Sequence, residues 1–338
     1  MSAKAKRVLR LALSLVLSVL FLFLAFRKAS LEEILTAFRG ANYWWLLLMF
    51  VVLLISHAFR SLRWRYLLNP IKPDIGLRNL YSAVMVGYMM NNVLPRAGEI
   101  VRPYAIGKLE NIRVGAALGT IVVERIMDIL SFLVLIALIP FVYEGPLTDT
   151  FPWLEQGGIW LGVATTMLLV FLVTMMARRD WTDTLLRFIT KVVPARAGAR
   201  LERLAHSFLD GFLFMKEPRS FVAILVLSVM IWGLYGVMTY VAFFAFDLGA
   251  TLGPGAALVV LAISSIGVAI PTPGGTGTYH FFTSETLTRL FGVPSGPALS
   301  YAAATHAVGF VGVTLIGLYF FLHDQIRISD AVAERGKE

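Results

Sequence analysis

The chain has 338 residues, of which 58% are hydrophobic, and its mean hydropathy is +0.75. These values lie far above those of a soluble domain and indicate an integral membrane protein. The formal net charge is +9, but the basic residues flank apolar segments, which argues against nucleic-acid binding. The absence of cysteine excludes disulfides, thiolate metal sites and cysteine nucleophiles.

Six apolar segments are long enough to cross a bilayer, which takes about 20 residues of helix. They lie near 9–27, 43–63, 117–140, 158–177, 221–246 and 298–322. The first follows a basic N-terminus, yet no small-residue cleavage site comes after it, so we expect an uncleaved span rather than a signal peptide. We therefore predict an all-α integral membrane protein with one polytopic domain over residues 1–338.

Two further apolar segments fit a single crossing poorly. Residues 79–94 form a short segment that ends in Asn-Asn-Val-Leu-Pro. Residues 248–284 carry no charged side chain and are interrupted by Pro-Thr-Pro-Gly-Gly-Thr-Gly at 271–277. Broken backbone is tolerated in lipid only where it is buried in protein or lines a cavity. We predict that both segments are re-entrant helical hairpins, each of which breaks near mid-depth and returns to its own side.

The distribution of basic residues gives an orientation. With the N-terminus inside, six crossings and two re-entrant hairpins, 25 of the 30 Lys and Arg residues lie inside and four lie outside. This excess follows the positive-inside rule and would be lost if either hairpin were a full crossing. We expect a multi-pass protein of the cell inner (plasma) membrane with both termini in the cytoplasm.

The sequence carries a weak internal repeat. Residues 115–125 resemble residues 296–306 at a constant offset, so that His306 stands opposite Arg125. Each similar stretch follows a broken segment and, before that, an aromatic-rich span. We predict repeat halves at 43–140 and 221–322, linked by the span at 158–177 and a cytoplasmic amphipathic segment at 178–219. Because one span separates the halves, the repeat should be inverted, and the two breaks should meet near the midplane.

The residues around the two breaks are candidates for substrate binding. The spacing of Arg96, Glu99 and Arg102 predicts one helical face. Helices that begin near Gly98 and near Thr278 would direct free backbone N–H groups toward the membrane centre, where they favour an anion. The candidates here are Asn91, Asn92, Arg96, Glu99, Arg102, Gly274, Gly275, Thr276, Thr278 and His280. Alternatively, Arg96 and Glu99 pair only with each other at the cytoplasmic surface.

Three charged residues, Glu124, Arg125 and Asp128, lie inside the third predicted span. Charges within a span cost on the order of 2.5–3.5 kcal/mol each and are usually paired. Helical spacing places Glu124 and Asp128 on one face and brings Arg125 within reach of Asp128. All three are candidate substrate contacts, or they form a structural lock between this helix and the first hairpin. His306 is either a ligand contact or a hydrogen-bonding packing residue.

No soluble catalytic module is apparent. The chain contains no Walker A motif, no Gly-x-Ser-x-Gly and no His-Glu-x-x-His. We therefore expect no enzymatic activity, no cofactor and no metal site. An apolar stripe at helical spacing within 178–219, with arginines nearby, predicts a helix that lies on the inner leaflet.

Three stretches together resemble a known family. They are Asn-Asn-Val-Leu-Pro-Arg-Ala-Gly-Glu-Ile-Val-Arg at 91–102, Glu-Arg-Ile-Met-Asp at 124–128 and the Pro/Gly-rich break at 271–277. They are similar to the transmembrane region of lysylphosphatidylglycerol synthases, the flippase-like domain of multiple peptide resistance factors. The resemblance implies a domain that moves aminoacylated phosphatidylglycerol between leaflets, here without the soluble aminoacyltransferase domain. Thr276 and the Tyr279-His280 pair depart from the common family pattern, which argues against a lysyl-lipid cargo.

The resulting hypothesis is a flippase-like transporter of a phosphate-bearing lipid. Candidate cargoes are an aminoacylated or anionic phospholipid, or a polyprenyl-phosphate glycolipid. One alternative is an intramembrane enzyme acting on a lipid headgroup, and another is a non-transporting membrane partner of a lipid glycosyltransferase. The expected partners are a membrane lipid and, beyond it, a second copy of the chain or a lipid-synthesising enzyme.

Overall fold

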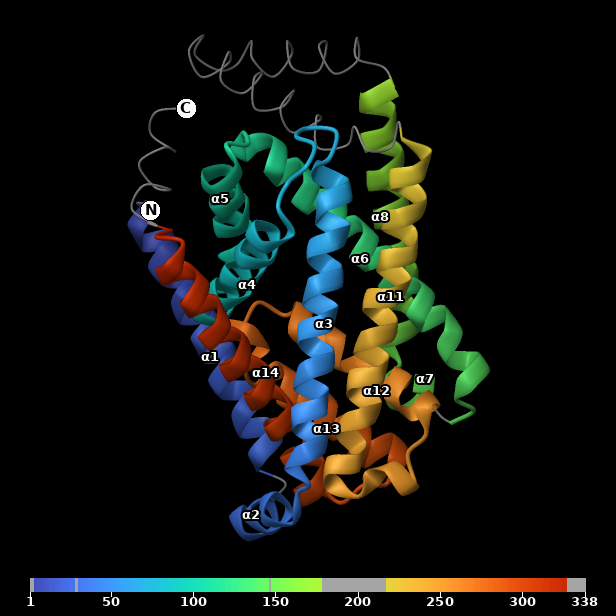
Figure 1. The fold of residues 1–338 in the computed structure, drawn as a ribbon. Helices are drawn as coiled ribbons and strands as arrows, with labels where there is room; N and C mark the ends of the chain where they lie inside the picture. Colours follow the sequence, from blue (N-terminus) through green and yellow to red (C-terminus); the bar gives the residue numbers. More distant parts are fainter. Residues whose placement is uncertain (1–2, 28–29, 146, 178–216, 327–338) are drawn as a thin grey trace.

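The structure is a computed structural model that describes residues 3–27, 30–145, 147–177 and 217–326. Throughout these residues the regular structure is helical, and no strand occurs in them. Figure 1 shows α3 and α11 running side by side along the length of the molecule, with α1 and α14 inclined across one flank. The chain is therefore all-α, as predicted.

The helices follow one another with short connections. Their bounds are α1 Ala3–Phe26, α2 Leu31–Gly40, α3 Tyr43–Leu68, α4 Leu77–Val93, α5 Gly98–Glu110, α6 Val114–Val142, α7 Leu147–Thr150, α8 Trp153–Ala177, α11 Pro218–Phe243, α12 Pro254–Ala269, α13 Thr278–Phe291 and α14 Ser295–His323. Three short 3-10 turns complete the described elements, η2 Phe244–Phe246, η3 Leu248–Ala250 and η4 Pro273–Gly275. Most of the predicted amphipathic segment at 178–219 lies outside the described residues.

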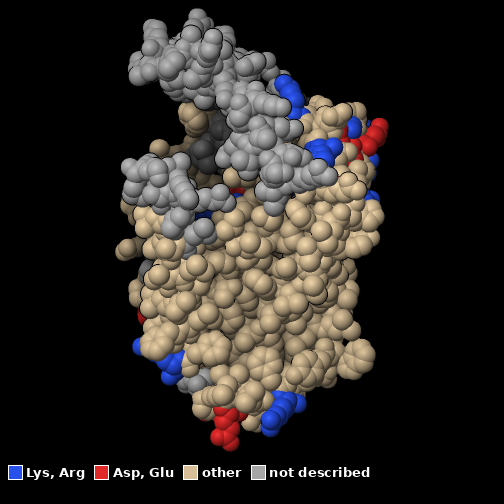
Figure 2. Space-filling view, turned by 90° about the vertical axis from the view of Figure 1, so that its left-hand side faces the viewer, with Lys and Arg blue, Asp and Glu red and all other residues tan. Residues whose placement is uncertain are grey.

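Within the residues that the structure describes, four helices are long and apolar enough to cross a membrane, which makes this a multi-pass membrane protein. They are Tyr43–Leu68, Val114–Val142, Arg219–Phe246 and Ser295–His323, and they coincide with four of the six predicted spans. A fifth is counted if Ala12–Phe26 and Leu31–Gly40, bent by 83°, form one span. The predicted span at 158–177 falls within α8. Figure 2 shows a broad uncharged band, with the visible charged side chains gathered near the two ends of the molecule.

The two interrupted segments each form a pair of adjacent helices. In the first pair, Gly87 of α4 lies so close to α5 that a Cβ built on Gly98 would meet the Gly87 carbonyl oxygen at 2.0 Å. In the second pair, a Cβ on Gly267 of α12 would lie 2.9 Å from the carbonyl oxygen of Thr278 in α13. Glycine is therefore required at Gly98 for the helices to approach this closely. The predicted helix starts near Gly98 and Thr278 are confirmed.

Two carboxylates tie the helix ends together at the start of α4. Glu110, at the end of α5, accepts hydrogen bonds from Lys72 and Asn79, both at 2.7 Å. Asp324, just beyond α14, accepts from Arg78 at 2.6 Å and from the hydroxyl of Ser82. Burial raises the pKa of both carboxyls, but these hydrogen bonds and charges outweigh that effect and leave each pKa below its ordinary value.

Acidification should weaken these two ties. A carboxyl whose pKa is lower in the folded state stabilises the fold above its unfolded pKa, and this stability is lost as pH falls through the folded pKa. We expect the thermal unfolding midpoint in detergent to fall as pH drops below about 4. The fall should be smaller in Asp324→Asn, which has one such carboxyl fewer. Asp74→Asn, whose side chain is 96% exposed, is the control and should keep the wild-type profile; equal profiles in all three would contradict the prediction.

Candidate functional site

A buried cluster of arginines and carboxylates joins α3, α5 and α6. At its centre is Glu124 of α6, whose side chain has no exposed surface. Arg102 of α5 donates to both of its carboxylate oxygens, at 2.8 and 2.9 Å. Arg60 of α3 donates to the same carboxylate at 2.5 Å. Guanidinium groups that bond a carboxylate through two nitrogens form strong, directional pairs.

Asp128 is the second carboxylate and lies one helical turn further along α6. It accepts from Arg60 at 2.9 Å and from Arg63 at 2.7 Å. Arg125 lies 3.4 Å from Asp128 and 3.3 Å from Glu124. The predicted i,i+3 contact of Arg125 with Asp128 is thus confirmed, and both carboxylates face the same arginines.

Aromatic and hydroxyl side chains surround the cluster. The guanidinium of Arg102 lies 3.8 Å from the ring centroid of Trp64, a close cation–π contact. On the α11 side, Tyr235 accepts a hydrogen bond from Arg60 at 3.0 Å, and Ser228 accepts one from Arg63 at 3.0 Å. These contacts fix the guanidinium planes, so the cluster is pre-organised.

The cluster is enclosed except along one edge. The side chains of Arg60, Arg63 and Arg102 are 4%, 0% and 7% exposed, whereas that of Arg125 is 43% exposed. Asp128, at 13%, lies between these extremes. A ligand that reaches the cluster would therefore meet Arg125 first.

The two breaks lie against each other. Asn92 donates to the carbonyl of Phe310 at 3.2 Å and to Thr314 at 2.8 Å, both on α14. A Cβ on Gly274, whose φ is +56°, would lie 2.7 Å from the Asn92 amide oxygen. Arg96, itself at φ 60°, reaches the carbonyl of Ala269 at 3.4 Å. Residues on both sides of the two breaks are thus in contact.

The second break is lined by two imidazoles. His306 of α14 donates to the carbonyl of Gly274 at 3.0 Å, and its ring centroid lies 4.6 Å from that of His280. Nδ1 of His280 accepts from the backbone N–H of Gly277 at 3.3 Å. Thr278 is buried and donates to the carbonyl of Gly275 at 3.1 Å. Both histidines therefore contact the Gly-rich turn.

The first turn of α5 differs from the expectation of free backbone donors. The N–H of Gly98 donates to the side chain of Asn91 at 2.8 Å. The next three N–H groups donate to the carbonyls of Arg96 and Ala97, at 3.0 to 3.2 Å. All four donors are taken, because the chain itself supplies acceptors for the backbone N–H groups at the start of this helix. An anion would find its donors on the arginine side chains instead.

The expected common face of Arg96, Glu99 and Arg102 is also corrected. Arg96 precedes α5, has a left-handed backbone and is exposed, while Arg102 is buried in the cluster. Glu99 is half-buried in the first turn, and Thr276 is half-buried beside the buried Gly275. The site candidates therefore divide into the arginine–carboxylate cluster and the contact between the breaks.

Arg60 and Arg63 are cluster residues that sequence reasoning missed. In the sequence they stand at the end of an apolar segment, as flanking basic residues do, but α3 continues to Leu68 and buries both. Their spacing of three places them on one helical face with Trp64 beside them. This spacing indicates a shared face, but it does not identify the partners Glu124 and Asp128 on α6.

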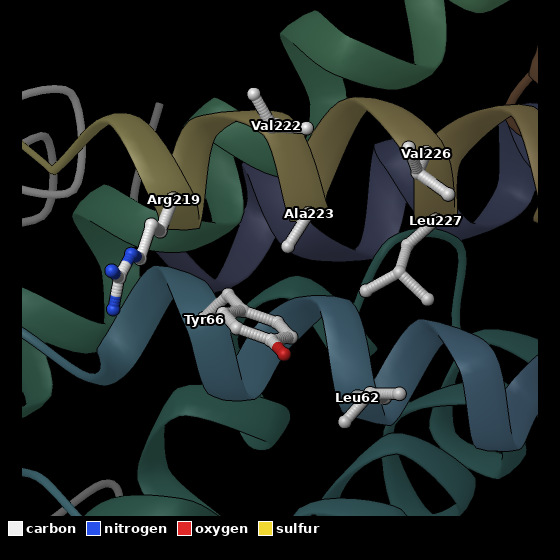
Figure 3. A pocket seen from close by; sticks show the side chains of 7 residues that line it. All are labelled: Leu62, Tyr66, Arg219, Val222, Ala223, Val226 and Leu227. Atoms are coloured by element: carbon white, nitrogen blue, oxygen red, sulfur yellow. The ribbon is translucent and has the colours of Figure 1, made fainter.

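A shallow groove runs between α3 and α11. It has a volume of about 550 Å³ and is lined mainly by apolar side chains: Leu62, Tyr66, Val222, Ala223, Val226 and Leu227. Figure 3 shows Arg219 at one end of the groove. The same two helices carry Arg63 and its partner Ser228, so the groove and the cluster share a helix pair.

The described residues contain no group of three or more His, Cys, Asp or Glu side chains that could hold a metal ion. The four arginines of the cluster are hydrogen-bond donors, which suit an anionic ligand.

Fold and cluster together define a multi-pass helical membrane protein with a buried, arginine-rich polar site. The chain belongs to the family of the lysylphosphatidylglycerol synthase transmembrane region, whose model matches residues 11–317. It is 24% identical to a UPF0104 membrane protein of Methanocaldococcus jannaschii, over 90% of this chain and 91% of that one. It is 28% identical to another from Methanothermobacter thermautotrophicus, over 72% and 75%.

A third relative carries a different name. It is the glycosyltransferase AglD of Haloferax volcanii, which is 23% identical over 95% of this chain but only 55% of its own length. No solved structure matches the chain.

Neutralising the central carboxylate should destabilise the fold strongly. Glu124→Gln leaves Arg102 and Arg60 buried beside a neutral amide, and breaking a buried pair in this way costs about 3–5 kcal/mol. The measurement is the unfolding free energy in detergent. Arg102→Gln/Glu124→Gln should recover part of the loss, because it removes one of the uncompensated charges. The exposed Asp74→Asn should change stability by less than about 0.5 kcal/mol; a similar small effect of Glu124→Gln would show that the cluster is not a structural tie.

Proposed function

We propose that this protein is a flippase-like lipid transporter that moves a phosphate-bearing lipid between leaflets. The observation that carries the proposal is the contact between the two breaks, Asn92 against Gly274 and Arg96 against the Ala269 carbonyl. Interrupted helices whose breaks meet inside a bundle are typical of transporter binding sites. The membrane-domain family is consistent with this role.

In this proposal α4–α5 and α12–α13 are re-entrant hairpins of an inverted repeat. Equivalent contacts in the two halves support it, because α4 packs on α14 and α12 packs on α6. The close approach of Gly87 to α5 also has a counterpart in the approach of Gly267 to α13. The six crossings are then α1, α8 and the four candidate spans, because each hairpin returns to its own side. With six crossings, both termini lie on the cytoplasmic side of the inner membrane.

The lipid is held in two parts. Its phosphate binds at the exposed edge of the cluster, where Arg125 is accessible and Arg102 lies behind it. Its tails stay in the apolar groove between α3 and α11 or in the surrounding bilayer. The cluster and the groove share α3, which carries Arg60 and Arg63 of the cluster and Leu62 and Tyr66 of the groove, and this suits an amphipathic ligand.

The second candidate function is that of a non-transporting partner of a lipid glycosyltransferase. The observation that favours it is the relative named glycosyltransferase AglD, only 55% of which is matched. A chain like this one then acts beside a transferase and presents a lipid to it. An enzymatic role has no comparable support in the geometry.

Reconstitution separates the two functions. The full chain is placed in liposomes that contain a trace of phosphatidylglycerol labelled with a reducible fluorophore on an acyl chain. A membrane-impermeant reductant then reports how much label reaches the outer leaflet. Reduction that proceeds beyond the outer-leaflet half, absent in protein-free liposomes, supports transport. A half-reduced plateau in protein-containing and empty liposomes alike, for labelled phosphatidic acid as well, would contradict it and favour the partner role.

Substitution of Gly274 should stop transport. In Gly274→Ala the new methyl group meets the Asn92 oxygen and the Phe310 ring, both at 2.7 Å, so the two breaks are forced apart. We expect at least about a tenfold loss of transport rate, because a misplacement of about 1 Å costs about a hundredfold in a pre-organised site.

Gly292→Ala is the matched control. Gly292 has a similar backbone, with φ +65°, but no atom lies within 4 Å of its Cβ position. Both variants therefore carry the same left-handed backbone strain, and only Gly274→Ala disturbs the break contact. Equal transport by the two variants, at matched unfolding temperatures, would show that the break contact is not part of the transport path.

A further inference from the structure

The arginine–carboxylate cluster holds more positive than negative charge. Four guanidinium groups, from Arg60, Arg63, Arg102 and Arg125, face only two carboxylates, those of Glu124 and Asp128. The described part of the cluster thus has an excess of two positive charges. An uncompensated charge is strongly unfavourable when it is buried, so the excess calls for an anion.

Among the described residues, the other titratable groups beside the cluster do not supply that anion. Tyr235 is hydrogen-bonded to Arg60, Tyr88 lies under the same guanidinium, and His57 stacks on Tyr88 with ring centroids 4.5 Å apart. Tyrosine and histidine carry no negative charge near neutral pH, and a protonated His57 would raise the excess further.

The cluster also has unused hydrogen-bond donors. The Nε atoms of its four arginines are buried and have no partner among the described residues: Arg60, Arg63, Arg102 and Arg125. Arg60, Arg63 and Arg102 each use both terminal nitrogens on protein partners, and Arg125 uses Nη2. The Nε–H of each guanidinium is left without an acceptor. Phosphate oxygens are acceptors that match such donors in geometry and charge.

We propose that this site selects a lipid headgroup with two negative charges, a phosphomonoester or a diphosphate, over a phosphodiester with one. This inference rests on the proposed function and names the substrate class for it. A dianion cancels the whole excess charge, whereas a phosphodiester leaves one buried positive charge without a counterion. The half-exposed Arg125 provides the entrance, and the three buried arginines set the charge that the headgroup meets.

Paired lipids with identical tails test the charge preference. The purified full chain is titrated in detergent at pH 8 with dioleoyl phosphatidic acid, dioleoyl phosphatidylglycerol or dioleoyl phosphatidylcholine, and binding is read by native mass spectrometry. A phosphomonoester is mostly dianionic at this pH because its second pKa is about 6. We expect phosphatidic acid to bind at least about tenfold more tightly than phosphatidylglycerol, a difference that corresponds to about 1.4 kcal/mol.

Two variants change the excess charge in opposite directions. Arg125→Gln lowers it from two to one, so the preference for phosphatidic acid should shrink toward equality. Asp128→Asn raises it to three, so the preference should be kept or increased. The exposed Asp74→Asn should behave as wild type. Unfolding temperatures measured beside the titrations separate lost selectivity from lost fold.

The outcomes separate this inference from the proposed function. Equal binding of phosphatidic acid and phosphatidylglycerol, weakened equally by Arg125→Gln, would overturn the preference for a dianion. The proposal that the cluster binds a lipid phosphate would still hold. Equal binding of all three lipids would overturn both. A preference for phosphatidic acid that neither variant alters would show that the lipid binds outside the arginine–carboxylate cluster, and this would contradict the inference. Inorganic phosphate that stabilises the protein as strongly as phosphatidic acid would overturn the lipid assignment in favour of a soluble anion.

Discussion

The structure depends on one buried carboxylate, that of Glu124, because arginines from two other helices converge on it. Arg60 arrives from α3 and Arg102 from α5, and neither has enough exposed surface to be solvated in its absence. Apolar packing between helices is weakly selective in a bilayer, since lipid tails are as apolar as leucine. The ion cluster therefore fixes α5 against α3 and α6 in a way that packing alone does not, and a surface ion pair of the same chemistry would contribute little.

Polar side chains at the two breaks form hydrogen bonds with backbone groups of the chain itself. Asn91 satisfies the first N–H of α5, and Arg96 reaches the Ala269 carbonyl across the break contact. An unsatisfied backbone group costs several kcal/mol away from water, so an interrupted helix has to recruit such partners. In the transport proposal, the anionic part of the lipid is therefore directed to the arginine cluster, where donors remain, rather than to the N-terminus of α5.

Local features of the sequence sufficed to predict where the two segments break and where their second helices begin, because closely spaced proline and glycine, as at 271–277, disfavour a continuous helix. The neighbours of Arg125 on α6 could also be predicted, since helical spacing is a local rule. Arg60 and Arg63 could not be assigned to the site in this way. Their pairing with Glu124 and Asp128 joins helices distant in sequence, and their position at the end of a span looks the same as that of any flanking basic residue.

The two halves carry different chemistry on what we propose is a common scaffold. Where the first half has the guanidinium of Arg125, the second has the imidazole of His306, which is already bonded to the Gly274 carbonyl. A phosphate would bind strongly to the first group by charge and weakly to the second. In the transport proposal this asymmetry sets which side holds the headgroup longer and how fast it leaves, but differential binding alone cannot set a net direction. In the transport proposal the direction of movement then comes from the lipid gradient or from a coupled ion, and the arginine cluster controls selectivity and rate.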